Sequence, residues 1–366
     1  MKIALIYDRV NKWGGAERVL LALHKIWPQA PLYTSVYDPG LAEWAKVFEV
    51  HTSFIQNLPI PKNAHEYYPF IMGIAFESFK FDDFDVVISV TSEFAKAVVT
   101  KPNTLHICLC LNPTGYLWSA NQSYFFDKNF LFKLFALPII NYLRFYDLIV
   151  SHRPDDYVAI SNVVASRIKK YYLQTSQVIY PPVNLFDGKQ MPQTDIPVKN
   201  FYLIVSRLVP NKRLDLAIKA FNQLGDKLIV IGVGKQMNNL KSKAKKNIEF
   251  IGNLTDEQLA GYYASCKAMV VPGEEDFGIA MVEAQGFGKP VIAYGNGGAL
   301  EIIEENKTGW FFKEQTASSL AKVIKATRNL EINPLECITN AKRFSKMRFE
   351  KEFKKFVENR YEQWHR

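Results

Sequence analysis

The stretch that decides the fold is VPGEEDFGIAMVEAQGFGKPVIAYGNGGALEII, which covers residues 271–303. It begins as the end of an apolar strand, passes through a polar turn at 273–276, and enters a helix near Phe277 and Gly278. A strand that leads through a short turn into a helix is the repeating unit of an open parallel sheet. In such sheets ligands bind beyond the carboxyl ends of the strands, so we expect a ligand at this turn.

The alternation of apolar strands and amphipathic helices extends in both directions from this stretch. Helical spacing is clear after Gly14 and Gly15, where Val19, Leu20 and Leu23 share one helix face. Strands joined by helices form parallel sheets, so we predict an α/β protein with two doubly wound, Rossmann-like domains. The predicted strands are 2–7, 32–36, 85–89, 106–111 and 156–160 in the first half, and 201–206, 227–231, 248–251, 268–271 and 290–294 in the second.

The chain length fits two domains. With 366 residues, it exceeds the usual size of one domain, about 100–150 residues. We predict an N-terminal domain over 1–185, a linker over 186–199 that is rich in Pro, Gly, Gln and Asp, and a C-terminal domain over 200–344. The segment 345–366 predicts a charged amphipathic helix that crosses back to the N-terminal domain.

Composition is that of a globular protein, with 48% hydrophobic and 22% charged residues, and this excludes disorder. The four cysteines form neither a disulfide framework nor a paired zinc motif, which indicates a reducing cytoplasm. The first apolar run breaks at Asp8, so we predict no signal peptide. Uninterrupted apolar runs are too short for a membrane-spanning helix.

The formal net charge of +9 calls for an anionic partner. Nucleic acid, anionic lipid and a phosphorylated substrate all fit on charge alone. The lysine runs at 241–246 and 346–355 lack interleaved stacking aromatics, so we predict no nucleic-acid partner. The aromatic-rich stretch 116–150 leaves two interpretations open. We favour a buried helix of the N-terminal domain over a helix lying in a membrane interface, where the protein would be peripheral.

The turn and helix start after 271 can hold an anionic ligand. The backbone amides of Phe277, Gly278 and Ile279 open the helix without carbonyl partners inside it, so they can bind a phosphate. Glu283, further along the helix, can accept both hydroxyls of a ribose, and Glu275 can accept hydroxyls of a sugar. An acidic start that complements the helix dipole would account for Glu275 but not for Glu283 inside the apolar face.

Glu275 and Glu283, with seven residues between them that include Phe277 and Gly278, resemble the E-x7-E signature of retaining GT-B glycosyltransferases. The family is glycosyltransferase family 4 (glycosyl transferases group 1), and the chain resembles its bacterial polysaccharide and O-antigen mannosyltransferases. The resemblance covers nearly the whole chain and is tightest over 201–303. It implies the GT-B fold, in which two Rossmann-like domains face a central cleft and the C-terminal domain holds a nucleotide-sugar donor.

Further segments of the second half resemble the same family. Arg207 and Lys212, in SRLVPNKRLD after a predicted strand, match the family's diphosphate clamp. The resemblance thus implies a catalytic role for both, beside Glu275, because cations stabilise the charge that develops on a departing diphosphate. Gly234, in an IGVG turn, and Asn253, in an IGNL loop, match segments that contact the donor nucleotide.

In the first half, Gly14 and Gly15 match the family's N-terminal glycine loop, where the backbone can approach the donor diphosphate. The family usually reads Cys-His-Thr-Pro-x-Arg-Tyr-x-Trp near the catalytic centre, and this chain reads CLNPTGYLW at 110–118. Leu111 replaces the histidine and Gly115 replaces the arginine, which indicates an altered acceptor or a weakened enzyme. The acceptor-side residues implied by the match are Asn112, Tyr116 and Trp118.

The resemblance implies transfer of a sugar, with retention, to a saccharide or lipid-linked saccharide acceptor, and GDP-mannose is favoured over a UDP-sugar as donor. We expect a front-face mechanism in which a leaving phosphate oxygen takes the acceptor's proton. We expect no metal or other cofactor, because Arg207, Lys212 and the helix amides neutralise the diphosphate. The D-x-D sequence at 83–85 is predicted to be a surface turn. A GT-B-fold nucleotide-sugar isomerase and a catalytically weakened carbohydrate- or nucleotide-binding member remain as alternatives.

Overall fold

The computed structural model describes residues 1–59, 69–118, 130–185, 196 and 200–366, with only the backbone of 69 and 130–135. The predicted linker 186–199 lies almost wholly outside the described residues, as does the part of the aromatic stretch at 119–129. The chain divides into two compact units. Unit 1 comprises Met1–Pro182 and Phe349–Arg366, and unit 2 comprises Val183–Arg348.

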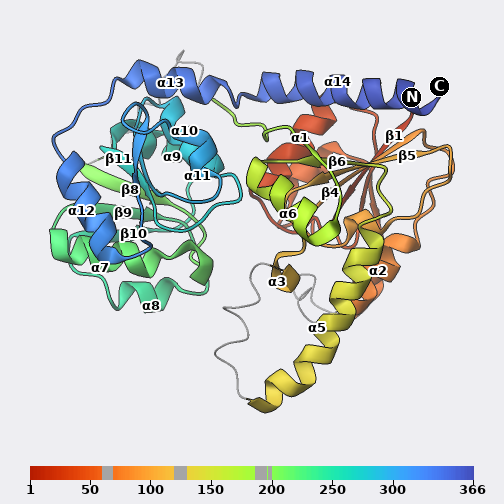
Figure 1. Ribbon diagram of the computed structural model, residues 1–366, viewed down its shortest axis with the longest axis horizontal. Coiled ribbons are helices and arrows are strands. Elements are labelled where there is room, and N and C mark those ends of the chain that lie inside the picture. Colours follow the sequence, from red (N-terminus) through yellow and green to blue (C-terminus); the bar gives the residue numbers. More distant parts are fainter. Residues whose placement is uncertain (60–68, 119–129, 186–195, 197–199) are drawn as a thin grey trace. The chain divides into compact units, whose positions relative to one another are not determined.

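Unit 1 is built on a seven-stranded parallel sheet with the strand order β3-β2-β1-β4-β5-β6-β7 (Figure 1). Strand progression reverses between β1 and β4, as in a doubly wound fold. The strands are β1 Ile3–Tyr7, β2 Leu32–Thr34, β3 Val50–Thr52, β4 Val86–Thr91, β5 Leu105–Cys110, β6 Asp156–Ala159 and β7 Gln177–Val178. The helices are α1 Gly15–Ile26, α2 Pro69–Glu77, α3 Gly115–Trp118, α5 Phe130–Val150, α6 Asn162–Tyr172 and α14 Lys346–Trp364, with 3-10 turns η1 Glu43–Val47, η2 Phe54–Asn57 and η4 Ala95–Ala97.

Unit 2 is built on a six-stranded parallel sheet with the strand order β10-β9-β8-β11-β12-β13. The strands are β8 Phe201–Val205, β9 Lys227–Ile231, β10 Ile248–Ile251, β11 Ala268–Val271, β12 Val291–Tyr294 and β13 Gly309–Phe312. The helices are η5 Pro210–Lys212, α7 Leu214–Leu224, α8 Met237–Lys241, α9 Asp256–Ser265, α10 Ile279–Gly286, α11 Ala299–Ile302, α12 Ala317–Thr327 and α13 Pro334–Lys342.

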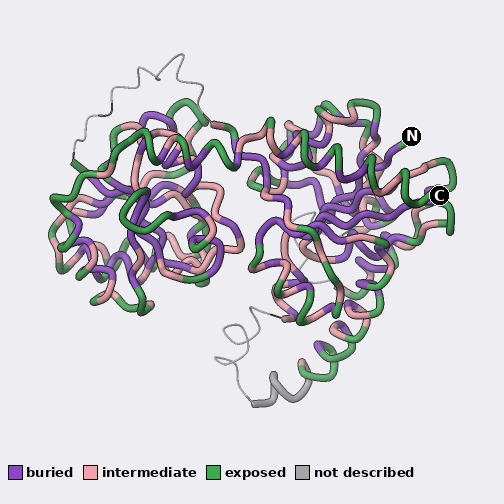
Figure 2. The backbone as a smooth tube through the Cα atoms, turned by 45° about the horizontal axis from the view of Figure 1, so that its top comes forward, coloured by how far each residue is buried: buried purple, intermediate pink, exposed green. Residues whose placement is uncertain are grey.

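The predicted α/β class with two doubly wound sheets is confirmed. Each sheet is buried between helices, and Figure 2 shows the buried strands at the centre of each unit. Local sequence explains the helices that cover them. In α9, Thr255 and Gln258 form a capping box, and α7 ends where Gly225 adopts a φ of 76°. The predicted turn at 83–85 also lies directly before β4, with Asp83 exposed.

The helix α14 completes unit 1, although it is the last element of the chain. Its buried side chains are Phe349, Phe353, Phe356 and Val357. Phe353 packs edge-on against Trp27, with ring centroids 6.2 Å apart. Arg360 Nε donates to Asp156 Oδ2 over 2.6 Å at the start of β6. Residues from opposite ends of the sequence therefore share the core of one unit.

Candidate active site

The carboxyl ends of β8 and β11 define the candidate donor site in unit 2. These two strands are neighbours, but β9 lies on the far side of β8 and β12 on the far side of β11. Ligands of doubly wound sheets bind at such a switch point. The loop after β8 carries Arg207 and Lys212, and the loop after β11 carries Glu275.

An ion pair joins these two loops. Lys212 Nζ donates to Glu275 Oε2 over 2.5 Å, and the side chains are only 15% and 19% exposed. The structure thus brings together two of the three residues predicted to be catalytic. Arg207, the third, is exposed in the same loop as Lys212.

Glycines allow the two loops to approach this closely. A Cβ atom at Gly273 would lie 2.8 Å from the Asn211 carbonyl oxygen and from Lys212 Cα, so a larger residue there would push the loops apart. On the other side, the Gly298 amide donates to the Glu275 carbonyl oxygen over 2.8 Å. The backbone of Glu275 is therefore held by the loop after β12, and its carboxylate is held by Lys212.

A second brace at this edge was not predicted from the sequence. Arg213 Nη1 donates to Gln315 Oε1 over 3.0 Å, and Gln315 Nε2 donates to the Pro272 carbonyl oxygen over 3.2 Å. The bond from Arg213 spans 102 positions of the sequence. No local motif predicts such a contact, because the contact depends on which strands become neighbours in the sheet.

The predicted anion-binding helix start is formed by α10. The helix begins at Ile279, and Gly278 precedes it with a φ of 106°. A side chain at Gly278 would be strained by that φ and would also meet the Met281 side chain. Phe277 is buried and packs against Phe344, with ring centroids 5.5 Å apart. The aromatic ring anchors the turn, and the glycine directs the chain into the helix.

Glu283 lies inside α10 and is half-buried. Its Oε2 atom accepts a hydrogen bond from Tyr263 Oη of α9 over 2.9 Å. The Tyr263 ring stacks on Phe287, with centroids 5.7 Å apart. Tyr263 therefore orients the carboxylate predicted to bind the ribose, and no sequence motif pointed to this partner.

The remaining predicted donor residues of unit 2 lie in loops at the same edge of the sheet. Gly234 follows β9, and a Cβ there would lie 2.3 Å from the Leu208 carbonyl oxygen. The glycine turn is thus packed directly on the loop that carries Arg207. Asn253 is exposed in the loop between β10 and α9, at the edge strand of the sheet.

In unit 1 the predicted glycine loop also lies at a switch point, between β1 and β4. Gly14 caps α1, and Gly15 is its first residue. Glu17 of the same motif is buried and accepts a hydrogen bond from Tyr7 Oη over 2.6 Å. Arg9 forms a two-bond pair with Glu93, at 2.5 and 2.6 Å. The sequence did not predict this pair.

Asp8 is the centre of a buried network at the same switch point. Its carboxylate accepts hydrogen bonds from Thr91 Oγ1 and from the amides of Ser92, Phe94 and Ala95, at 2.8–3.0 Å. Burial, together with the nearby charge of Glu93, raises the pKa of Asp8. These bonds fix the start of the loop after β4 against β1.

The predicted acceptor loop, 112–118, is fastened by a buried carboxylate of α5. Asp147 accepts hydrogen bonds from Thr114 Oγ1 over 2.8 Å and from Trp118 Nε1 over 2.7 Å. It also pairs with Lys96 Nζ over 2.7 Å. Burial has the largest single effect and lowers the pKa of Lys96. The charge and hydrogen bond of Asp147, with smaller contributions from Cys110 and Cys108, together outweigh it, so the pKa is raised. The network holds the loop to the helix.

The three predicted acceptor-side residues have different environments. Asn112 Oδ1 accepts a hydrogen bond from Arg167 Nη1 of α6 over 3.1 Å. Trp118 stacks on Tyr171, with centroids 5.1 Å apart. Burial, chiefly, raises the pKa of Tyr116, so this phenol stays protonated. Asn112 and Trp118 therefore both contact α6.

His106 does not take the place of the histidine that is missing at Leu111. His106 lies on β5 and is fully buried, with Nε2 2.9 Å from Ser89 Oγ. Burial, aided by the Arg153 charge, lowers the pKa of His106 to about 3. It is therefore neutral near pH 7 and enclosed in the core of unit 1.

A family model described as glycosyl transferases group 1 matches residues 188–344. This segment is nearly all of unit 2, including the switch point with Lys212 and Glu275. The C-terminal unit is a group 1 glycosyltransferase domain. The predicted family is therefore confirmed.

Among curated relatives are an uncharacterized glycosyltransferase of Methanocaldococcus jannaschii, 27% identical over 209 residues, and the alpha-1,3/1,6-mannosyltransferase ALG2 of Dictyostelium discoideum, 25% identical over 274 residues. These matches cover 56% and 62% of this chain and 58% and 64% of the relatives. A GDP-mannose-dependent alpha-(1-6)-phosphatidylinositol monomannoside mannosyltransferase of Mycobacterium tuberculosis is 28% identical over 138 residues, which cover 33% of this chain and 36% of the relative. The chain thus spans less than two thirds of each relative.

Solved structures resemble nearly the whole chain, and not only the group 1 domain. Anabaena HepE in complex with UDP has a TM-score of 0.72 at 16% identity, covering 98% of this chain and 100% of that one. Sucrose-phosphate synthase from Thermosynechococcus elongatus has a TM-score of 0.71 at 15% identity, covering 99% and 100%. At such identities the likeness establishes the fold, which is that of GT-B glycosyltransferases.

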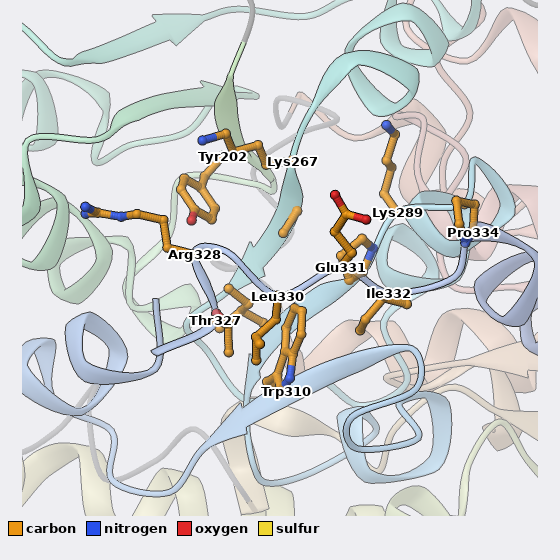
Figure 3. A pocket seen from close by; sticks show the side chains of 14 residues that line it. Tyr202, Lys267, Lys289, Trp310, Thr327, Arg328, Leu330, Glu331, Ile332 and Pro334 are labelled. Atoms are coloured by element: carbon orange, nitrogen blue, oxygen red, sulfur yellow. The ribbon is translucent and has the colours of Figure 1, made fainter. Parts of the chain in front are cut away.

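The group 1 domain also has a cavity of about 360 Å³ at the opposite edge of its sheet (Figure 3). Tyr202, Ala268 and Ile292 line it from the amino ends of β8, β11 and β12. Lys212 and Glu275 follow the carboxyl ends of strands of the same sheet. We therefore do not include this cavity in the donor site.

Two properties of the described residues concern metals and membranes. Within the described ranges, no group of three or more His, Cys, Asp or Glu residues could hold a metal ion. No helix among the described residues is long and apolar enough to cross a membrane.

Proposed function

We propose that the protein is a retaining glycosyltransferase that moves a sugar from a nucleotide-sugar donor to a saccharide or lipid-linked saccharide. The observation that carries this proposal is the Lys212–Glu275 pair at the switch point of a group 1 domain. GDP-mannose is the favoured donor because relatives named as mannosyltransferases match the chain. A UDP-sugar is the second candidate, since UDP is bound in the structurally similar HepE.

The donor diphosphate would bind Arg207, Lys212 and the amides that open α10. Glu275 would accept hydroxyls of the sugar, and Glu283 those of the ribose. In the front-face reaction, the bond from the sugar's anomeric carbon to the diphosphate oxygen breaks. The acceptor oxygen bonds to that carbon on the same face, and its proton passes to the leaving diphosphate. The two cations stabilise the developing negative charge, so the proposal requires no metal.

Leu111 and Gly115 keep a second candidate open, a weakened member that binds nucleotide or carbohydrate without efficient turnover. The loop contains neither the family's histidine nor its arginine. Arg167, however, brings a guanidinium group to Asn112 from α6. A cation next to the acceptor loop supports a changed acceptor over a lost activity.

Nucleotide binding is the first test. Melting temperatures would be measured with GDP, UDP, ADP, GDP-mannose, UDP-glucose and UDP-N-acetylglucosamine. A ligand at a hundredfold excess over its dissociation constant stabilises the native state by about 2.7 kcal/mol. We expect one nucleotide base to stabilise the wild type and to lose this effect in Glu283→Ala. Glu305→Gln, which changes an exposed carboxylate of the same unit, should retain the effect. No shift with any nucleotide would refute the donor site.

Turnover is the second test. Lys212→Gln should lower the rate of sugar transfer about a hundredfold, because one cation that stabilises the leaving group is lost. Lys219→Gln, an exposed lysine on α7, is the matched control and should be unchanged. Incubation with donor alone distinguishes the isomerase, which would form a new nucleotide-sugar without any acceptor. Equal activity of the Lys212 and Lys219 variants would contradict the proposed clamp.

A further inference from the structure

Trp13 is a large aromatic side chain on the surface of unit 1. It is 47% exposed, and it lies between β1 and α1, directly before Gly14. Proteins bury most of the area of their tryptophan side chains, so a ring exposed to this extent indicates a surface that meets a partner. The sequence motifs did not place Trp13 among the site residues.

The Trp13 ring is held in place by its neighbours. Trp44 lies beside it, with ring centroids 6.4 Å apart and an interplanar angle of 49°. Trp44 is itself fastened, because its Nε1 atom donates to the Lys12 carbonyl oxygen over 2.7 Å and its ring packs edge-on against the buried Phe48. The Arg18 guanidinium of α1 lies over the Trp13 ring, 5.9 Å from its centre. The exposed area therefore belongs to the opposite face and the edge of the ring.

The backbone that leads to Trp13 is also fixed. The Val10 amide donates to the Val36 carbonyl oxygen over 2.9 Å, and the Asp38 amide donates to the Val10 carbonyl oxygen over 2.8 Å. These bonds attach the start of the loop to the segment that follows β2. A ring that is ordered before a ligand arrives loses little conformational freedom on binding, which favours affinity.

The place of Trp13 in the fold points to a ligand site. Its loop follows β1 at the switch point between β1 and β4, where doubly wound sheets bind ligands. Glu93, from the loop after β4, pairs with Arg9 of the Trp13 loop. The Glu93 carbonyl oxygen also accepts a hydrogen bond from Thr114 Oγ1 of the acceptor loop, over 3.3 Å. Glu93 therefore connects the loop of Trp13 to the predicted acceptor loop.

The surroundings of the ring suit a sugar. A sugar has an apolar face of C–H groups, which can pack on an aromatic ring, and a rim of hydroxyls, which need hydrogen-bonding partners. The cations next to the ring are Lys12, which is exposed, and Arg18. Charged side chains at this position argue against a dry apolar interface with another protein. A nucleobase could also stack here, but the residues predicted to hold the nucleotide lie in unit 2.

We propose that Trp13 is the platform on which a sugar ring of the acceptor stacks. The inference rests on the proposed function and deepens it, because it assigns recognition of the acceptor to a saccharide ring rather than to an attached lipid. Such a platform supplies acceptor affinity in a chain that has no arginine at Gly115. Trp13 would then affect the binding of the acceptor and leave the binding of the nucleotide unchanged.

Saturation-transfer difference NMR of the full chain tests the proposal. The probes are the methyl glycosides of mannose, glucose and galactose. We expect at least one of them to bind the wild type, with the strongest signals from its ring C–H protons. Trp13→Ala should weaken that affinity about tenfold, because the stacking face is lost, and Trp13→Tyr should restore most of it. Trp364→Ala, which removes a ring that is 37% exposed on α14, is the matched control and should bind like the wild type.

Three results would overturn the proposal. The wild type could bind none of the glycosides, or Trp13→Ala could bind as well as Trp364→Ala. Trp13→Ala could also lose nucleotide-induced stabilisation, which would assign the ring to the donor. Melting temperatures without ligand would establish that the variants are folded.

Nucleotide-induced stabilisation of the wild type separates this proposal from the proposed function. Its absence, with glycoside binding retained, refutes the proposed function and leaves Trp13 as a saccharide-binding residue. Its presence, without binding of any glycoside, refutes the Trp13 platform alone.

Discussion

At the scale of single residues, we expect Lys212 and Glu275 to exchange partners when the proposed donor binds. Their charges are only partly exposed, so the cost of removing them from water offsets much of their attraction. The pair therefore contributes more to geometry than to stability. A bound diphosphate would attract the ammonium of Lys212, and sugar hydroxyls would donate to the carboxylate of Glu275. Neither charge would be left without a partner during this exchange.

His106 provides a prediction of pH dependence at the same scale. Its pKa is about 3 in the folded protein, against an ordinary value of 6.5. The unfolded chain therefore binds a proton first as the pH falls, and the stability of unit 1 decreases below pH 6.5. Between pH 7 and pH 5 this one residue should cost about 2 kcal/mol of unfolding free energy. Chemical denaturation at both pH values measures it.

The wild type is compared with His106→Gln, whose side chain cannot titrate. Between pH 7 and pH 5, the unfolding free energy of this variant should fall by about 2 kcal/mol less than that of the wild type. His152→Gln, at an exposed position, serves as the control and should follow the wild type. If all three proteins show the same pH dependence, His106 does not stay neutral in the folded state.

At the scale of elements, Asp147 joins α5 to three other parts of unit 1. It accepts hydrogen bonds from Lys96 of η4, from Thr114 and Trp118 of the acceptor loop, and from Tyr172 of α6. Removing one charge of a buried pair leaves the other without compensation. Asp147→Asn should therefore lower the free energy of unfolding by about 3–5 kcal/mol. Denaturant unfolding followed by circular dichroism is the measurement.

Two variants make this prediction specific. Asp82→Asn breaks an exposed pair with Lys101 and should cost less than about 1 kcal/mol. The double variant Lys96→Met with Asp147→Leu should be less destabilised than the sum of its single variants, because no unpaired charge stays buried. Simple additivity would mean that Lys96 and Asp147 are not coupled.

Elements were predictable where local pattern determines them. The ten predicted strands all form, and those at 227–231, 248–251 and 268–271 have the predicted bounds. β3, β7 and β13 were missed. β3 and β7 have three and two residues and no fully buried side chain, so they lack a continuous apolar run. β13 begins with a glycine and consists mainly of aromatic residues, which fit a loop or a helix as well as a strand.

The candidate site was predictable only in part, because some of its contacts join residues that are far apart in the sequence. Lys212, Glu275 and Glu283 stand in motifs whose spacing is visible in the sequence. Tyr263, the partner of Glu283, and Gln315, which braces Arg213 and Pro272 beside Lys212, come from other strand–helix connections, and Asp147 reaches the acceptor loop from 29 positions away. Such contacts follow from strand order and helix packing, which a one-dimensional pattern does not contain. Whether the motif residues bind the donor stays a prediction.

At the scale of the whole molecule, unit 1 is built from two segments that are far apart in the sequence, Met1–Pro182 and Phe349–Arg366. Phe353 of α14 is fully buried between Trp27 and Phe349, with ring centroids 6.2 and 5.4 Å away. Lys25 and Glu350 form an ion pair beside it, at 3.1 Å. The packing of unit 1 therefore cannot be complete until α14 has been synthesised. Unit 2 lies between these two segments in the sequence and has its own core.

This arrangement predicts that a core substitution in α14 destabilises unit 1 but not unit 2. Phe353→Ala removes a buried ring and should cost about 3–5 kcal/mol, because the surrounding side chains can only partly fill the space. Hydrogen exchange followed by mass spectrometry should show faster exchange in β1, β4 and β5, with β8, β9 and β11 unchanged. Met347→Ala, on the same helix but 76% exposed, should leave both units unchanged. Equal acceleration in both sheets would mean that the two units unfold as one, because separate cores allow the loss of one without the other.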